Sequence, residues 1–148
     1  MSSLFNTPFE ASIRALLVLY TVNPHGISAD RVAIYDFMTL YANDFGITDF
    51  NLHGKNDYNF SEFPYKRSLI SKGLKEATLD GMIAINKTHS GFEYQINQTG
   101  ISYVKSLNTD YSHQYLDTAK KVHDAFSSKN DMELMMEINH LAIKALRR

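Results

Sequence analysis

Residues 81–97, GMIAINKTHSGFEYQIN, form the stretch that decides the fold. Apolar and polar residues alternate on both sides of HSG, which is the period-two pattern of a half-buried sheet. Gly91 suits the positive φ of a tight turn, and we expect Phe92, Tyr94 and Ile96 to anchor the second strand to its surroundings. A lone hairpin is only marginally stable in water. We therefore predict a β-hairpin supported by helices.

Three helices are predicted before the hairpin. The first begins at TPFE, where Thr7 is a good N-cap, Pro8 takes the first helical position and Glu10 completes a capping box. The second follows the break NPHG, and the third covers residues 64–80. Gly73 inside the third helix costs about 1 kcal/mol relative to alanine. We therefore expect another backbone to approach the third helix closely at this glycine.

The predicted order of helix, helix, helix, two-stranded hairpin and helix is that of a winged-helix domain. The third helix would be its recognition helix and the hairpin its wing, with Thr99 capping the fourth helix. We predict a mainly α protein with a small β-hairpin, in which a winged-helix core spans residues 1–108. A C-terminal helical extension, residues 109–148, would pack on that core. The connection over residues 47–63 is rich in Asn, Asp and Gly and longer than most.

The composition narrows the class of protein. The chain has 148 residues, of which 44% are hydrophobic and 12% aromatic, as expected for a packed globular protein. Cysteine is absent, which excludes a disulfide framework and a Cys nucleophile and fits the reducing cytoplasm. The longest apolar run, ALLVLY, is too short to span a bilayer, and we expect no signal peptide. A net charge of −1 lacks the basic excess of a domain that mainly grips DNA.

Catalytic signals are missing from the sequence. None of the six histidines has HxxxH or HExxH spacing, and there is no GxSxG, P-loop or strand-associated GxGxxG motif. The acidic residues are scattered, and those near the start of the last helix suit a helix N-terminus. We therefore predict a non-enzyme with no catalytic residue, no metal site and no cofactor.

Basic residues on the third predicted helix form a candidate DNA contact. Arg67 and Lys75 are eight residues apart, so two steps of i, i+4 place them on one face of the helix, and the hairpin adds Lys87 near its turn. A solvated helix face would look the same, because the helix also carries acidic residues. The candidate DNA-contact residues are Lys66, Arg67, Lys72, Lys75 and Lys87.

The last segment, MELMMEINHLAIKALRR, is apolar around more of its circumference than a surface helix needs. Either it is enclosed inside the domain or its second face meets a partner. Methionine suits adaptable interfaces, and aromatic residues of the long connection would add to such a surface. The candidate protein-interface residues are Met135, Met136, Leu141, Ile143, Leu146, Tyr58 and Phe60.

Four stretches in order carry a family resemblance: TPFEASIRALLVLY, AIYDFMTLYANDFG, LHGKNDYNFSEFPYKRSLISKGLKEATLDGMI and GFEYQINQTGISYVKSLNTDYSHQYLDTAKKV. Together they span residues 7–122 and resemble the middle component of bacterial ABC-three-component systems, which include the Lamassu anti-phage systems. That family tends to have a proline-rich loop where this chain has GKNDYN.

The resemblance implies an accessory subunit that docks on an SMC-like ABC ATPase and helps to control an effector, often a nuclease. Such a complex would sense invading phage or plasmid DNA, with DNA contact by this subunit weak or indirect and no membrane involved. The alternative is a free-standing winged-helix transcription regulator, which would form a homodimer and bind its promoter in a salt-dependent manner.

Overall fold

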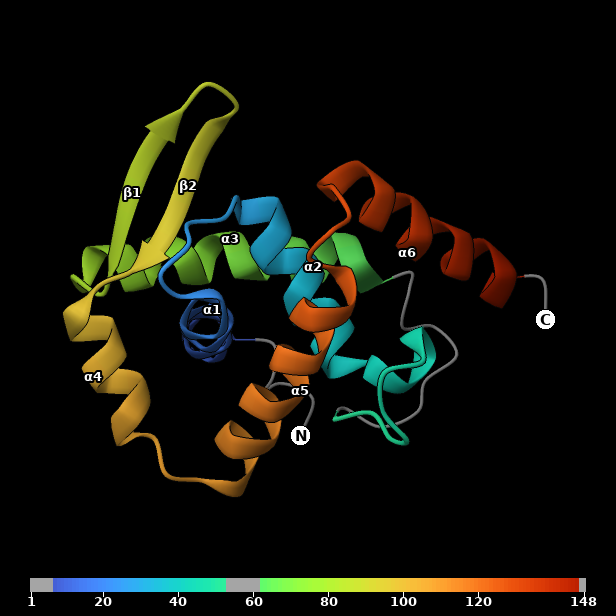
Figure 1. The fold of residues 1–148 in the computed structure, drawn as a ribbon, viewed down its shortest axis with the longest axis horizontal. Coiled ribbons are helices and arrows are strands. Elements are labelled where there is room, and N and C mark those ends of the chain that lie inside the picture. Colours follow the sequence, from blue (N-terminus) through green and yellow to red (C-terminus); the bar gives the residue numbers. More distant parts are fainter. Residues whose placement is uncertain (1–6, 53–61, 147–148) are drawn as a thin grey trace.

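The computed structural model describes residues 7–52 and 62–146 (Figure 1). Within these ranges the protein is mainly helical with one two-stranded antiparallel hairpin, which confirms the predicted fold class. No helix in the described part is long and apolar enough to cross a membrane. In chain order the elements are α1 (Pro8–Val22), α2 (Ala29–Leu40), the short 3-10 helix η2 (Ala42–Phe45), α3 (Phe63–Leu79), β1 (Ile83–Thr88), β2 (Gly91–Ile96), α4 (Gln98–Ser106), α5 (Asp110–Phe126) and α6 (Asp131–Leu146).

Helix α1 lies at the centre of the fold. It packs against α2, α3, α4, α5 and β2, and Figure 1 views it nearly along its axis. The predicted N-cap is confirmed, because Thr7 Oγ1 accepts a hydrogen bond from Glu10 N at 3.1 Å and Pro8 takes the first helical position. The run from Leu16 to Leu19 is at most 1% exposed. A helix that is apolar nearly all round is a central one, which explains why four helices surround it.

Helix α3 crosses α1 at Gly73. A Cβ atom built there would lie 2.6 Å from Ala11 C and 2.6 Å from Ser12 N, which is closer than real Cβ atoms approach backbone. The expectation of a close backbone approach at Gly73 is confirmed. The cost of glycine in the helix is offset by the tight contact that it permits between α1 and α3.

The hairpin has the predicted strands and one further connection. Ile83 of β1 pairs with Ile96 of β2, and Gly91 has φ +124° at the turn. The loop between α1 and α2 adds a single residue to the other edge of β2, where Ile27 N donates to Tyr94 O at 3.0 Å and Tyr94 N donates to Ile27 O at 2.7 Å. This pairing was not predicted, and it ties the hairpin to the first two helices.

Helix α4 is capped by Asn97, and the prediction of Thr99 as its cap is wrong. Asn97 Oδ1 accepts from Gly100 N at 2.9 Å, while Asn97 Nδ2 donates to Gly81 O at 2.8 Å. The asparagine side chain thus serves both the helix start and the beginning of the hairpin. Thr99 is the second residue of the helix, and its side chain is exposed.

Helix α5 belongs to the same core as the N-terminal helices. Thr109 and Ser112 form a capping box at its start. Its inner face contributes Tyr115, Val122 and Phe126, which are buried against α1 and α2. The boundary predicted after residue 108 falls in the connection before α5, and α5 itself completes the core around α1.

Candidate interaction surfaces

Helix α6 is attached to the fold along one side only. Leu134 and Ile138 are buried at its contact with α2. A reciprocal cap starts the helix, because Asn130 Oδ1 accepts from Glu133 N at 2.8 Å and Glu133 Oε1 accepts from Asn130 N at 3.1 Å. Among the described side chains of this helix of 16 residues, Leu134 and Ile138 are buried and Met135 packs partly against the core, so much of the helix surface stays outside the core.

A polar contact fastens the first turn of α6 to α2. Asp131 Oδ1 accepts from Arg31 Nε at 2.6 Å, and Asp131 Oδ2 accepts from Ser28 Oγ at 2.8 Å. Arg31 also donates to Lys129 O at 2.5 Å, which holds the connection between α5 and α6. Arg31 is 13% exposed in this arrangement, so the ion pair is partly shielded from water. These bonds set the position from which α6 leaves the body of the protein.

The outer face of α6 is apolar and exposed. Met132 is 73% exposed, Met136 65% and Ile143 51%. Met135 and Leu141, also predicted interface residues, are half-buried beside this face. Helix α6 is therefore not enclosed by the described part of the chain. The side chain of Leu146, and all of Tyr58 and Phe60, lie outside the described residues.

The hairpin carries a second exposed apolar face. Ile83 and Ile96 are buried at its base, but Ile85 is 43% exposed and Phe92 57% exposed further out on the same face. In Figure 1 the hairpin projects well beyond the helices. The prediction that Phe92 anchors β2 is wrong, because the turn end extends past the core. Ile96 and the half-buried Tyr94 hold the strand instead.

Two residues of the predicted DNA-contact face are engaged within the protein. Lys66 is 4% exposed, and burial lowers the pKa of its ammonium group. A side chain so enclosed is not placed to reach a phosphate backbone, which corrects the expectation for Lys66. Arg67 is accessible, but its guanidinium pairs with Asp30 of α2 at 2.6 Å. The burial of Lys66 follows from its place on the inner side of α3.

The remaining basic residues stay on the surface. Lys72 and Lys75 are exposed on the outer side of α3, and neither forms an ion pair within residues 7–52 and 62–146. Lys87 is exposed on β1, directly opposite Phe92 in the hairpin register. Leu79, at the end of α3, is 78% exposed. The basic surface is thus smaller than predicted and mixed with apolar side chains.

A buried polar cluster joins α1, α2 and α5. Arg14 Nε donates to Asp36 Oδ1 at 3.0 Å, and both side chains are 1% exposed. Tyr115 OH donates to the same oxygen at 2.5 Å. Burial, and then the charge of Asp36, raise the pKa of Tyr115 well above its ordinary value. The cluster is sealed from solvent and therefore fastens three helices together.

Sequence reasoning missed this cluster, although the signal was present. Arg14 stands in the apolar run IRALLVL and Asp36 in AIYDFM. A charged residue inside an apolar stripe indicates a buried partner of opposite charge, because an unpaired buried charge is very costly. Two residues of opposite charge on two predicted core helices would therefore have predicted a buried ion pair between them.

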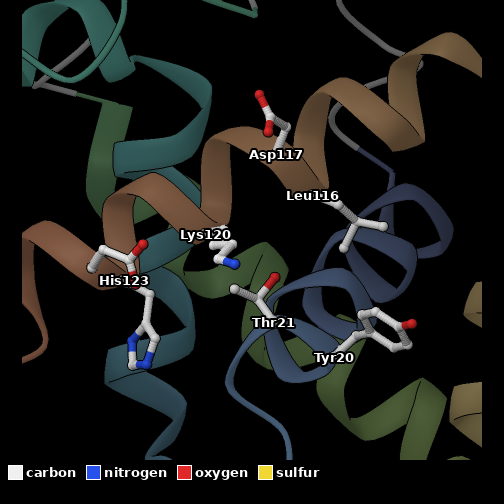
Figure 2. Close-up of a pocket in the computed structure, with 7 residues that line it drawn as sticks. Tyr20, Thr21, Leu116, Asp117, Lys120 and His123 are labelled. Carbon is white, nitrogen blue, oxygen red and sulfur yellow. The ribbon is translucent and has the colours of Figure 1, made fainter.

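An open pocket of about 460 Å³ lies between the end of α1 and α5 (Figure 2). His123 Nδ1 lies 3.0 Å from Tyr35 OH, and burial lowers the pKa of His123. Among the described residues, no group of three or more His, Cys, Asp or Glu side chains is arranged to hold a metal ion. The pocket is lined by side chains of α1 and α5: Tyr20, Thr21, Leu116, Asp117, Lys120, His123 and Asp124.

Comparison with protein families matches residues 4–148 to a family described as ABC-three component (ABC-3C) system Middle Component 2. No curated protein and no solved structure matches the chain. The family match extends beyond residues 7–122, which carried the resemblance, and includes α6. A middle component acts within a system of several components, so the other components are its expected partners. The chain belongs to the Middle Component 2 family of ABC-three component systems.

Proposed function

We propose that this protein is a non-catalytic adaptor subunit of an SMC-like ATPase complex in bacterial defence against phages or plasmids, of the Lamassu type. It docks on the ATPase and helps to control an effector, for which a nuclease is the expected class. Membership of the middle-component family, matched over residues 4–148, carries the proposal.

The exposed apolar surfaces support an adaptor role. Large exposed apolar patches on a protein mark sites of interaction with partners. Here Ile85 and Phe92 on the hairpin face, and Met136 and Ile143 on the outer face of α6, are exposed. Two separate faces let one subunit contact two partners at once.

The hairpin face is the proposed docking site for the ATPase. Its base is fastened to the core, because Ile83 and Ile96 are buried and the backbone of Tyr94 is hydrogen-bonded to that of Ile27. The exposed end presents an aromatic ring, an aliphatic side chain and Lys87. Aromatic and aliphatic anchors at the centre of a contact supply most of the binding energy at protein interfaces. Winged-helix geometry, with the hairpin as the wing, would present this face to the partner.

Absence of catalysis is part of the proposal. The sequence has no cysteine and none of the nucleophile, phosphate-binding or metal motifs discussed above. The buried titratable cluster of Arg14, Asp36 and Tyr115 is enclosed in the core, where no substrate can reach it. Nucleotide hydrolysis and nucleic-acid cleavage would belong to the other components.

Co-purification from cells that carry the complete system tests the docking proposal. We expect the tagged protein to bring down the ATPase component, and Ile85→Ser together with Phe92→Ser to abolish this association. The matched control is Phe50→Ser, because Phe50 is 52% exposed but lies outside the hairpin. The hairpin variant should also lose protection in a phage plaque assay. Recovery of the tagged protein alone from cells expressing all components would contradict the adaptor role, and unchanged recovery with the hairpin variant would contradict the docking site.

A winged-helix regulator is the second candidate, favoured by the exposed Lys72 and Lys75 on α3 beside the hairpin. It predicts salt-dependent binding to its own promoter, which Lys72→Ala with Lys75→Ala should weaken. Arg67 is less informative, because its ion pair with Asp30 would also be lost. No DNA affinity of the purified protein at low salt would exclude this function.

A further inference from the structure

Strand β1 is an edge strand whose outer side is uncovered in the described part of the chain. It pairs with β2, and its other main contact is with α3. In Figure 1, β2 lies on the side of β1 that faces α2, and no described element lies beside the other edge of β1. The loop residue Ile27 pairs with β2 and so covers the far edge of the sheet. One edge of the hairpin is therefore closed within the protein, and the other is open.

The register fixes which backbone groups of β1 face the open edge. In an antiparallel pair, opposite residues alternate between those that exchange both hydrogen bonds and those that exchange none. Tyr94 uses its N–H and its C=O for Ile27, so it exchanges no hydrogen bond with Ile85, which lies opposite. The N–H and C=O of Ile85 therefore point away from β2. By the same alternation, the backbone groups of Ile83 and Lys87 point to the open edge.

A second hydrogen bond supports this assignment. Asn97 N donates to Met82 O at 3.1 Å, directly beyond the pair of Ile83 and Ile96 at the base of the hairpin. Because bonded and non-bonded pairs alternate, that pair of isoleucines is non-bonded, as the assignment requires. Within residues 7–52 and 62–146, the outward backbone groups of β1 make no hydrogen bond. They are the donors and acceptors that a further strand would use.

The sequence of β1 leaves this edge open to another strand. Proteins protect edge strands with proline, bulges and charged side chains, lysine above all. The strand IAINKT contains no proline, and its six residues pair with β2 without a bulge. Its single charged residue is Lys87, which is exposed near the turn. A lone lysine opposes pairing with a basic or identical strand, but it attracts a strand with an acidic residue at that position.

A second copy of β1 fits this edge poorly. Outward residues must lie opposite one another, so an antiparallel copy centred on Ile85 would bring Lys87 beside Ile83 of the other copy. Ile83 is 5% exposed, because its side chain is held against the core. An ammonium group beside a buried aliphatic side chain loses hydration without gaining a partner. A register shifted toward the turn avoids this contact, but it pairs only two outward residues of each strand.

We propose that an extended segment of the ATPase component adds to β1 as a third strand. The segment carries an acidic residue beside Lys87 and an apolar residue beside Ile85, on the face that also holds Phe92. Main-chain hydrogen bonds to the edge supply affinity, and the alternate side chains supply specificity. The chain belongs to a system of several components, so a strand from another component is the expected occupant. The proposal rests on the proposed function, because it states how the hairpin binds the ATPase.

Proline at position 85 tests the edge while leaving the pairing of β1 with β2 intact. Proline lacks the backbone N–H, which at Ile85 points away from β2, and such positions tolerate proline. The matched control is Ile85→Val, which keeps this N–H and has a side chain about as large as proline. In co-purification from cells with the complete system, Ile85→Pro should recover at least about tenfold less ATPase than Ile85→Val. Equal recovery would overturn strand addition and leave docking through the hairpin face intact.

Amide hydrogen exchange resolved to single residues tests the same edge in the unmodified chain. In the free protein, the amides of Ile85 and Lys87 should exchange faster than those of Ala84 and Asn86, which are bonded to β2. In the purified complex with the ATPase, the Ile85 and Lys87 amides should slow by at least about tenfold. Exchange of these two amides that stays fast in the complex would overturn the proposal, even if the proline variant failed to fold.

Charge reversal tests the acidic character of the added strand. Lys87→Glu should weaken co-purification with the ATPase, whereas Lys105→Glu, at an exposed position of α4, should not. Equal recovery with these two variants would contradict the acidic partner. Sedimentation of the isolated chain tests the other occupant, because a dimer that Ile85→Pro dissociates would place a second copy on the edge and overturn the proposal. Failure of the unmodified chain to recover the ATPase would contradict the proposed function itself.

Discussion

Replacing Asp36 with asparagine should destabilise the protein strongly. The substitution keeps the size of the side chain and an oxygen that can accept the hydrogen bond from Tyr115, which is 2.5 Å away in the structure. What it removes is the negative charge opposite Arg14, and both groups are 1% exposed. Breaking a buried ion pair by neutralising one partner typically costs about 3 to 5 kcal/mol. We expect a loss of that size in the free energy of unfolding.

The comparison with an apolar replacement shows where the loss comes from. A domain of ordinary stability has about 5 to 15 kcal/mol in total, so the asparagine variant loses a large share of it. If all three polar groups are exchanged, as in Arg14→Met with Asp36→Leu and Tyr115→Phe, the Arg14–Asp36 ion pair is removed as a whole and neither of its two charges is left behind. Such exchanges are often neutral or stabilising. The triple variant should therefore be more stable than the single Asp36→Asn variant.

Urea unfolding followed by circular dichroism measures both differences, provided that the slope of the free energy against urea stays the same. A loss of less than about 1 kcal/mol for Asp36→Asn would refute the reasoning, because it would mean that Arg14 is solvated or paired elsewhere. A triple variant less stable than Asp36→Asn would show that packing, and not the unpaired charge, sets the cost.

Three further predictions concern α3, α6 and pH. Gly73→Ala should lower the free energy of unfolding by about 2 kcal/mol in urea titrations, because the added Cβ would lie 2.6 Å from the α1 backbone. The exposed Ser71→Ala is the control and should change it by less than about 0.5 kcal/mol, and an equally small change for Gly73→Ala would contradict this reasoning. Asp131→Asn weakens the bonds to Arg31 and should speed amide hydrogen exchange across α6 by about fivefold, leaving α1 unchanged; equal exchange in α6 would show that Leu134 and Ile138 alone hold the helix. Burial lowers the pKa of His123, so the unfolded chain binds the proton more readily, and the free energy of unfolding should fall as the pH drops below about 6.5. The His123→Gln variant should lose less of this free energy between pH 7 and 5, and a loss identical to that of the unmodified chain would contradict the assignment to His123.

Local patterns were predicted well because neighbours along the chain decide them. The start of α1 depends on Thr7, Pro8 and Glu10, which lie within four residues of the chain, and the structure has Thr7 as the predicted N-cap. The hairpin depends on alternation and on a turn with Gly91, and both are present. At α4 two cap residues competed, and Asn97 prevailed over Thr99 because its amide also reaches Gly81. That second bond joins residues 16 apart, so only the folded chain shows it.

The candidate surfaces were predicted in part. The surplus apolar character of α6 was visible, and Met136 and Ile143 are exposed as a partner-binding face requires. The same reasoning placed Lys66 on a basic face, whereas the structure buries it. The four basic residues of α3 do not all lie on one side of the helix, and Lys66 lies on the side that faces the core. Phe92 matched the apolar side of the strand, but its distance from the helices depends on how far the hairpin projects.

The sequence by itself determined the order of helices and hairpin, the absence of cysteine chemistry and the family, since these follow from periodicity, composition and ordered motifs. Only the tertiary structure decided which apolar residues are covered. Gly73 had to meet α1, Arg14 had to find Asp36, and Ile27 had to pair with Tyr94 before the exposed faces of the hairpin and α6 were defined. The physical reason is that burial depends on contacts between elements distant in the chain, and a surface available to partners is what those contacts leave uncovered.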